Sequence, residues 1–298
     1  MLLPEIPEVQ RFINYIRFEK RYSAHTITAY QDDLSDFFSF TSRVFESDSP
    51  NSVSTLMIRS WMAEMTEAGI IPRSINRKIS CLKSFFKFCR THSIRDDNPA
   101  SAIRLLKTRK RLPSFVEEHQ MDTLFTHVEF PDEYNGRVEK LMLRLLYQCG
   151  IRVGELVSIR QQQIDSYQKV IRILGKGNKE RMIPVNPDLL NEISAYCKEK
   201  KSLGFSDDYL LIKDNGKQYT SRNVYDVVKK WLSLVTTAEK KSPHVLRHSF
   251  ATHLMNNGAD LNAVKDLLGH SSLAATQVYT HNSIEKLRDI HRKAHPKG

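Results

Sequence analysis

A break in the apolar pattern between Asn98 and Pro113 constrains the fold of this chain more than any other feature. The segment NPASAIRLLKTRKRLP has a proline near each end and no helical or strand periodicity, and it carries Arg104, Lys107, Arg109, Lys110 and Arg111. A chain of 298 residues is long enough to bury two cores. We therefore predict two domains, residues 1–98 and 114–298, joined by a basic linker at 99–113.

Residues 4–92 carry apolar side chains at helical spacing and contain no convincing strand. We predict four helices there: 7–20, a second that starts near Thr26, 52–68, and a fourth that begins at Pro72. Gly69 suits the end of the third helix, and Pro72 suits the first turn of the fourth. The N-terminal domain is therefore expected to be all-α.

The fourth predicted helix has a cationic face and an apolar face. At 100° per residue, its apolar side chains fall opposite an arc of basic ones, Arg73, Arg77, Lys83, Lys87 and Arg90. An ordinary solvated amphipathic helix gives the same pattern. Because the formal net charge of +11 favours a polyanionic partner, we predict that these five residues bind DNA, together with Arg109, Lys110 and Arg111 of the linker.

The second domain is expected to combine helices with a small antiparallel sheet. The β-branched runs 170–174 and 181–185 flank the sequence GKGNKE, a pattern that predicts a β-hairpin with a cationic tip. Helical periodicity predicts the other elements: 117–128, 137–149, 187–201, 221–235, 243–256, 262–268 and 283–294. The whole chain is thus predicted to be mainly α, with an all-α N-terminal domain and an α+β C-terminal domain.

Side chains suited to phosphate chemistry gather in the second domain. The stretch 243–281 contains His244, Arg247, His248, His253, His270, Tyr279 and His281. His244 and Arg247 stand at i, i+3 on a predicted helix, and together they resemble an anion clamp. Arg152 lies beside a helix start in apolar surroundings and needs an anion or a carboxylate, which Glu155 could supply. Lys176 lies at the glycine-rich hairpin tip.

Each of these features also has a purely structural interpretation. An Arg152–Glu155 pair, a basic hairpin tip and a buried tyrosine all occur without a phosphate site. A metal site at His244 and His248 is disfavoured, because Val245 stands where the HExxH motif has glutamate. The ordered, joint occurrence of Arg, Lys, His-x-x-Arg, His and Tyr favours phosphate chemistry, and we interpret the remaining histidines, His248, His253 and His281, as structural.

Cysteine spacing and apolar content indicate the compartment. The four cysteines form no CxxC pair, so the sequence predicts neither a disulfide framework nor a zinc site and fits a reducing environment. The N-terminal sequence MLLPEIPEVQ lacks a basic segment followed by a long apolar run, and no stretch reaches the roughly 18 apolar residues of a membrane span. We expect a cytoplasmic protein without a membrane partner.

Five segments of the second domain resemble the tyrosine recombinase (phage integrase) family of site-specific DNA recombinases: GIRVGEL, GKGNKER, HVLRHSFATHL, LLGHSS and YTH. The helical first domain with its NPA linker fits the core-binding domain of that family. The chain length and the tail DIHRKAHPKG are similar to those of the compact Xer-type members. No key position departs from the family pattern, and His270 stands where some relatives carry tryptophan.

The resemblance implies a covalent mechanism. Tyr279 would attack the scissile phosphate to form a 3′-phosphotyrosine, while Arg152, Arg247 and His270 would bind and stabilise the phosphate oxygens. Lys176 would protonate the leaving 5′-oxygen, His244 would assist proton transfer at the tyrosine, and Glu155 would orient Arg152. The resemblance implies no metal ion, no cofactor and no ATP.

The resemblance also implies partners. These are a double-stranded DNA recombination site, a tetramer of identical or sister recombinases on two duplexes, and a cell-division DNA translocase as a candidate regulator. The expected role is resolution of chromosome dimers, with a mobile-element integrase or transposase and a non-catalytic DNA-binding accessory protein as alternatives. A topoisomerase is disfavoured by the short chain, and a metal nuclease is a further alternative. We expect the helix at 283–294 to dock on a neighbouring protomer rather than on its own domain.

Overall fold

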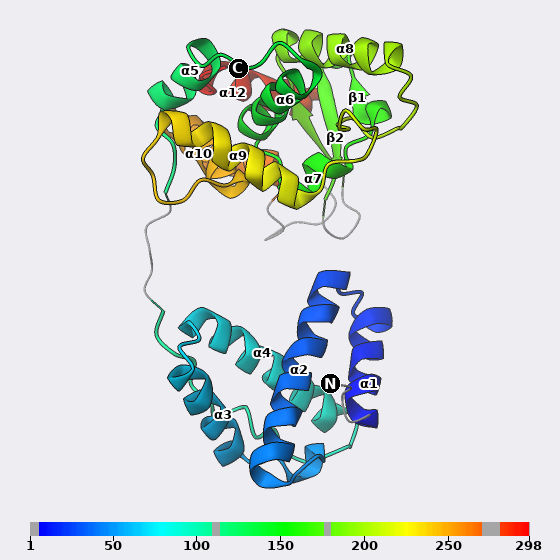
Figure 1. Ribbon diagram of the computed structural model, residues 1–298, viewed down its shortest axis with the longest axis vertical. Helices are drawn as coiled ribbons and strands as arrows, with labels where there is room; N and C mark the ends of the chain where they lie inside the picture. Colours follow the sequence, from blue (N-terminus) through cyan, green and yellow to red (C-terminus); the bar gives the residue numbers. More distant parts are fainter. Residues whose placement is uncertain (1–5, 109–113, 176–179, 270–280, 298) are drawn as a thin grey trace. The chain divides into compact units, whose positions relative to one another are not determined.

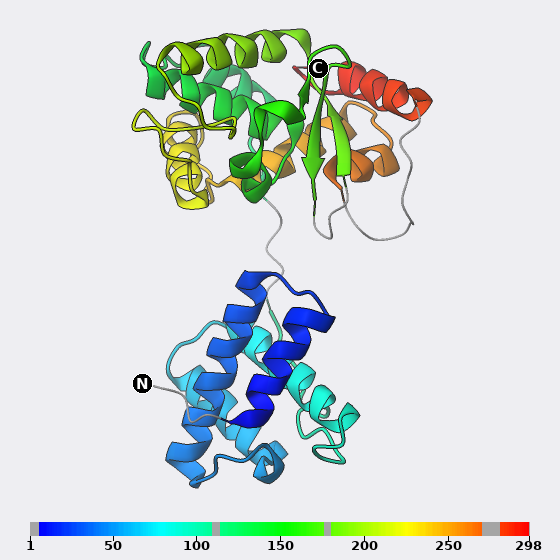
Figure 2. The same cartoon turned by 90° about the vertical axis from the view of Figure 1, so that its right-hand side faces the viewer.

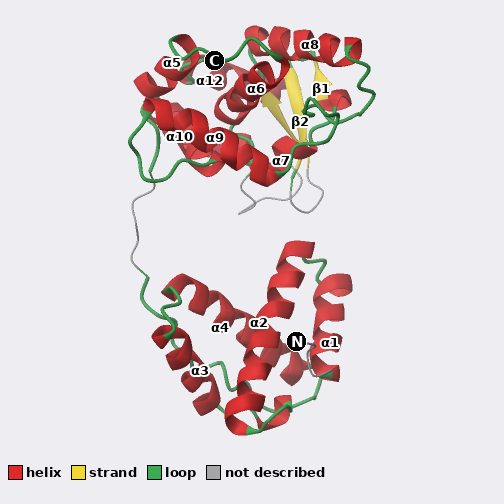
Figure 3. Cartoon of the chain, in the orientation of Figure 1, coloured by secondary structure: helices red, strands yellow, loops and turns green. Residues whose placement is uncertain are grey.

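The computed structural model describes residues 6–108, 114–175, 180–269 and 281–297, and for residues 281–286 only the backbone. The chain divides into two compact units, an N-terminal unit (Met1–Arg111) and a C-terminal unit (Leu112–Gly298), shown in Figure 1. Helices dominate both units, and one small antiparallel sheet lies in the C-terminal unit (Figure 3). This mainly α architecture with a small sheet confirms the predicted fold class.

The described part of the N-terminal unit is built from α1 (Pro7–Asn14), α2 (Ala24–Phe45), α3 (Thr55–Glu67) and α4 (Pro72–Thr91). A π-helical turn, η1 (Tyr15–Glu19), continues α1, and a 3-10 turn, η2 (Pro50–Ser52), precedes α3. The hydroxyls of Ser23 and Ser54 accept hydrogen bonds of 3.3 Å from backbone N–H groups in the first turns of α2 and α3. Gly69 follows α3 with φ 74, and Pro72 opens α4.

Helix α4 supplies much of the N-terminal core. Its predicted apolar face is buried completely, with Ile75, Ile79, Leu82, Phe85 and Phe86 at 0% exposure. The Phe85 ring packs edge to face against Phe12 of α1 and Phe38 of α2, at centroid distances of 5.5 and 5.9 Å. Since the apolar side chains of α4 face the core, its basic side chains lie on the opposite face of the helix.

The first part of the predicted linker packs on the N-terminal unit. Ala100 and Ile103 are buried in its core, and the Asn76 side chain exchanges two hydrogen bonds with the backbone of Leu106, at 2.8 and 2.9 Å. These contacts fix a segment whose sequence has no helical or strand periodicity of its own. For that reason the sequence alone predicts a linker here. The linker residues Arg109, Lys110 and Arg111 lie outside the described residues.

The C-terminal unit begins with α5 (Glu118–Thr126), α6 (Tyr134–Cys149) and α7 (Val153–Ser158), followed by a 3-10 turn, η3 (Gln161–Gln163). Strands β1 (Ile164–Asp165), β2 (Val170–Leu174) and β3 (Glu180–Pro184) form an antiparallel sheet in that order. Val170 pairs with Pro184 and Leu174 with Glu180, so the two predicted runs do pair, with the second strand starting one residue earlier than the predicted 181–185. The remaining helices are α8 (Pro187–Ser202), α9 (Ser221–Val235), α10 (Pro243–Asn256), α11 (Leu261–Leu268) and α12 (His281–Ala294).

Helix α6 is enclosed in the C-terminal core. Its run of apolar side chains from Leu141 to Leu146 is interrupted only by Arg144, and a helix that is apolar around most of its circumference must be covered on several sides. Helices α8 and α10 pack against it, and β3 contacts α11 and α12 (Figure 2). The sheet edge and the end of α11 are thereby brought next to the loop that follows α6.

Helix α12 packs on its own unit in this single-chain structure. Leu287 and Ala294 are buried in one cluster with Phe250 and Leu254 of α10, and Asn257 donates a 2.9 Å hydrogen bond to the Ala294 carbonyl. The Nε2 atom of His291 lies 2.8 Å from the Gln148 carbonyl. Docking on a neighbouring protomer stays a prediction for the assembled protein.

None of the helices in the described ranges has the length and hydropathy needed to cross a membrane. All four cysteines are free thiols. Burial raises the pKa of Cys81, Cys89 and Cys149, so these thiols stay protonated at neutral pH.

Gly150 ends α6 with φ 58, and a Cβ added there would lie 2.4 Å from the Phe250 ring. Gly204 is a matched control in the same unit, with φ 78 and no atom within 4 Å of an added Cβ. We predict that Gly150→Ala lowers the free energy of unfolding by about 3 kcal/mol and Gly204→Ala by about 1 kcal/mol, because only the former adds a ring clash to the backbone strain.

Urea denaturation followed by Trp231 fluorescence measures this difference. Trp231 belongs to the C-terminal unit and Trp61, the other tryptophan, to the N-terminal unit, so a Trp61→Phe background isolates the signal. Equal losses for the two glycine variants would contradict the packing argument.

Candidate active site

Arg152 and Glu155 form the pair suggested by their spacing. Arg152 is the N-cap residue of α7, directly after the turn at Gly150 and Ile151, and Glu155 stands in the first turn. The Arg152 backbone N–H donates to Oε2 of Glu155 at 2.7 Å, and its Nη1 donates to Oε1 at 2.9 Å. The carboxylate therefore holds both the helix start and the guanidinium.

Arg181 on β3 is a second guanidinium on the same carboxylate. Its Nη1 and Nη2 donate to the two oxygens of Glu155 at 2.8 and 2.7 Å, in a two-point ion pair with both side chains less than 10% exposed. The motif-based prediction did not include Arg181. The alternation of side chains along β3 could have indicated this ion pair. Arg181 shares the inward face of β3 with Ile183, and an inward arginine requires an acidic partner.

The two arginines keep Glu155 ionised. Burial by itself raises the pKa of Glu155, but hydrogen bonds and charges from Arg181 and then Arg152 outweigh burial and lower the pKa to about 2. The carboxylate is therefore negative throughout the physiological range and forms a permanent part of the site.

Arg247 on α10 is buried beside this pair. Its side chain donates to the carbonyl oxygens of Gly150 and Leu268, at 2.5 and 2.6 Å. Within the described residues, no ion pair includes Arg247. Burial, followed by the charge of Arg152, lowers the pKa of Arg247 to about 9. One carboxylate among three guanidiniums leaves excess positive charge in a partly dry site, and such a site favours an anion.

The three arginines meet at the carboxyl end of α11. Arg181 Nε donates to the Leu267 carbonyl at 3.0 Å, Arg247 Nη2 to that of Leu268 at 2.6 Å, and Arg152 Nη2 to that of Gly269 at 3.4 Å. Carbonyls at a helix end have no partner within the helix and carry partial negative charge. The arginine cluster (Arg152, Arg181 and Arg247) thus holds the helix end that directly precedes His270 in the sequence.

Sequence comparison agrees with this geometry. Residues 114–286 match the Phage integrase family, and residues 9–92 match its N-terminal SAM-like domain. The chain belongs to the phage integrase family of tyrosine recombinases. The resemblance predicted from the five segments is confirmed, as is its extension to the N-terminal unit.

Named relatives place the chain among the Xer-type members of the family, and a solved structure shares its fold. Tyrosine recombinase XerC of Thermodesulfovibrio yellowstonii is 34% identical over 296 residues, covering 97% of this chain and 96% of the relative. Tyrosine recombinase XerC of Listeria welshimeri is 36% identical over 293 residues, covering 97% of each. The fold is similar to that of XerH site-specific recombinase bound to a palindromic difH substrate in a post-cleavage complex, with TM-score 0.71, 17% identity, and 96% and 82% coverage.

The other predicted site residues are placed as follows. His244 lies in the first turn of α10, exposed, one turn before Arg247, and no metal-binding group of three or more His, Cys, Asp or Glu is found in the described ranges. His253 is buried, with Nδ1 2.9 Å from the Tyr147 hydroxyl, which fits a structural role. Lys176, His270 and Tyr279 lie outside the described residues, and so does the side chain of His281.

The predicted DNA-binding residues of α4 differ in their surroundings. Arg77 forms an ion pair with the buried Asp33, and Lys83 donates to the Ile103 carbonyl at 2.7 Å. Arg73, Lys87 and Arg90 are exposed, and the ion pairs of the described residues include none of these three. These three side chains are the freest to meet a phosphate backbone.

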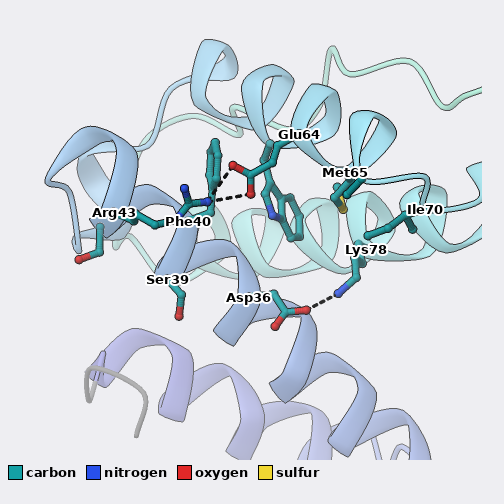
Figure 4. Close-up of a pocket in the computed structure, with 11 residues that line it drawn as sticks. Asp36, Ser39, Phe40, Arg43, Glu64, Met65, Ile70 and Lys78 are labelled. Carbon is teal, nitrogen blue, oxygen red and sulfur yellow. Dashed lines mark hydrogen bonds and ion pairs between the residues drawn. The ribbon is translucent and has the colours of Figure 1, made fainter. Parts of the chain in front are cut away.

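A hollow of 590 Å³ lies among α2, α3 and α4 of the N-terminal unit (Figure 4). The Arg43–Glu64 and Lys78–Asp36 ion pairs line it, together with Phe40 and Met65. Since its charged groups already pair with one another, the hollow differs from the arginine cluster, where positive charge is in excess.

We predict that Glu155 contributes to stability only above strongly acid pH. Its pKa falls from an ordinary 4.5 to about 2 on folding, so its contribution is fully present above pH 4.5 and is lost as the pH falls towards 2. The difference in unfolding free energy between wild type and Glu155→Gln should shrink by on the order of 3 kcal/mol across this window. Urea denaturation by Trp231 fluorescence at several pH values measures it, and a constant difference would contradict the prediction.

Proposed function

We propose that this recombinase cleaves and rejoins DNA strands at a specific site through a covalent bond between Tyr279 and the 3′-phosphate, and that it resolves chromosome dimers. The observation that carries the proposal is the arginine cluster, in which the partners of buried Arg247 among the described residues are carbonyl oxygens, beside the ion-paired Arg152. A phosphodiester anion is the ligand that this excess positive charge would stabilise best.

Arg152 and Arg247 bind the non-bridging oxygens of the scissile phosphate in this proposal. Their charge offsets the negative charge that grows on those oxygens in the pentacoordinate transition state. Glu155 supports the reaction by fixing Arg152, with which it shares two hydrogen bonds. His270, the residue after the helix end that the arginines hold, donates one further hydrogen bond to the phosphate.

Protons move through two other side chains. Lys176 protonates the 5′-oxygen as it leaves, and His244 assists removal of the proton from the Tyr279 hydroxyl. Both assignments follow from the family motifs. Because the phosphotyrosine retains the energy of the phosphodiester bond, the free 5′-hydroxyl can reseal the strand without ATP. Guanidinium groups take the electrostatic role that a metal ion has in many phosphoryl transfers, so the reaction is metal-independent.

Recombination joins two duplexes, each cleaved on both strands, so the working assembly is a tetramer of this chain or of this chain with a sister recombinase. Relatives named XerC that align over 97% of this chain favour chromosome dimer resolution over integration of a mobile element. Regulation by a cell-division DNA translocase belongs to the same proposal. We place the reaction in the cytoplasm, which suits the four free thiols.

The decisive experiment traps the covalent intermediate. The DNA site is first recovered by sequencing DNA covalently attached to the protein in cells, and it is then rebuilt as a nicked suicide duplex. Wild type should form an adduct that survives SDS in the presence of EDTA, whereas Tyr279→Phe should bind the duplex without forming one.

Arg247→Ala should slow adduct formation by roughly 10³-fold, because a donor to the transition-state oxygens is lost. An adduct in Tyr279→Phe would contradict the proposal, and an adduct-free wild type would favour a DNA-binding accessory role.

A second experiment tests DNA binding by α4. Arg90→Ala should reduce the slope of log K against log salt concentration by about 1, because one phosphate contact is removed. Arg59→Ala is the matched control, since Arg59 is an exposed arginine of the same unit on α3. Filter binding of the same duplex between low and moderate salt gives both slopes, and equal changes in the two variants would count against a specific role of α4.

A further inference from the structure

Arg181 lies within the arginine cluster although no role was assigned to it from the motifs. We propose that Arg181 is a positioning residue for DNA cleavage: it fixes the Glu155 carboxylate that orients Arg152, and it ties that carboxylate to the end of α11, from which the chain continues to His270 and Tyr279. This inference rests on the proposed recombinase function.

The Glu155 carboxylate is fixed on both oxygens. Oε1 accepts from Nη1 of Arg152 at 2.9 Å and from Nη1 of Arg181 at 2.8 Å. Oε2 accepts from the Arg152 backbone N–H and from Nη2 of Arg181, both at 2.7 Å. The two-point contact with Arg181 sets the plane of the carboxylate, so a rotation of that plane would break the ion pair and displace the Arg152 guanidinium.

The third donor of Arg181 reaches α11. Its Nε donates to the Leu267 carbonyl at 3.0 Å, and a Cβ added at Gly269 would lie 2.9 Å from Arg181 Cδ. The helix end therefore rests directly on the arginine side chain. A lysine could donate to the carboxylate from one ammonium group but could not span both partners with the planar geometry of a guanidinium.

Arg181 also keeps Glu155 charged. The charged groups that face Glu155 in the described structure are Arg152 at the start of α7, Arg181 on β3 and Arg247 on α10. Burial raises the pKa of Glu155, and Arg181 is foremost among the groups that lower it. Without Arg181, a buried carboxyl with one remaining arginine partner takes up a proton more easily, and a protonated carboxyl orients Arg152 less well.

The experiment compares Arg181→Met with Arg181→Lys, Glu155→Gln and the double variant Glu155→Gln/Arg181→Met. Arg172→Met is the matched control, because Arg172 on the neighbouring strand β2 pairs with Asp165, outside the cluster. Single-turnover adduct formation is measured on the nicked suicide duplex from about pH 5.5 to 8.5, alongside noncovalent DNA affinity and thermal unfolding.

Arg181→Met should slow adduct formation about 100-fold at neutral pH while DNA affinity changes by less than about threefold, since misplacement of a catalytic group by about 1 Å has effects of this size. The rate of Arg181→Met should fall further as the pH is lowered. Wild type and Arg172→Met should have the same pH profile as each other. Arg181→Lys should recover part of the rate. The double variant should be no slower than Glu155→Gln alone, because both changes act through one carboxylate.

A folded Arg181→Met that cleaves at the wild-type rate with the wild-type pH profile would overturn the inference. If Arg181→Met does not fold, the double variant decides, because its buried pair is neutral: a rate close to that of Glu155→Gln supports the inference, and a rate well below it would overturn the claim that Arg181 acts through Glu155. Failure of wild type itself to form an adduct would instead overturn the proposed function. In that case, carbon-13 NMR titration of Glu155 in wild type and in Arg181→Lys would test by itself whether Arg181 keeps this carboxyl charged, and identical titrations would overturn that part of the inference.

Discussion

The arginine cluster of the C-terminal unit depends on one buried carboxylate. Glu155 accepts hydrogen bonds from the backbone that begins α7, from the Arg152 side chain and from Arg181 on β3. Removal of its charge would leave three guanidiniums facing one another in a poorly solvated site, where breaking a buried pair by loss of one partner is strongly destabilising. Glu155 thus joins the start of α7 to β3, Arg181 extends this link to the end of α11, and the carboxylate offsets part of the positive charge of the cluster.

The concentration of positive charge in the arginine cluster also destabilises the folded state. Burial and the neighbouring arginines lower the pKa of Arg247 to about 9, so its charged form is less favourable there than in water. Carbonyls of Gly150 and Leu268 stabilise it only in part. In the proposed function a phosphate anion would supply the missing countercharge, and Arg152 and Arg247 would be in place before it binds. The proposed binding of phosphate and the local cost in stability would then arise from the same residues.

Local sequence signals predicted the features that depend on neighbouring residues. Helical periodicity predicted the apolar face of α4, the two β-branched runs predicted the pairing of β2 with β3, and i, i+3 spacing predicted the Arg152–Glu155 pair. Features that depend on distant contacts were missed. Arg181 meets Glu155 across 26 residues, residues 100–106 are held by α4 rather than by any pattern of their own, and the two-residue β1 is too short for alternation to register. The family motifs, not local physics, assigned Lys176, His270 and Tyr279.

Gly150 meets three structural requirements at one position. Its positive φ ends α6, the absence of a side chain admits the Phe250 ring, and its carbonyl accepts from Arg247. A mutation at this position would disturb the core and the surroundings of Arg247 in one step. A stabilising change elsewhere could then restore the free energy of folding without restoring the position of that arginine.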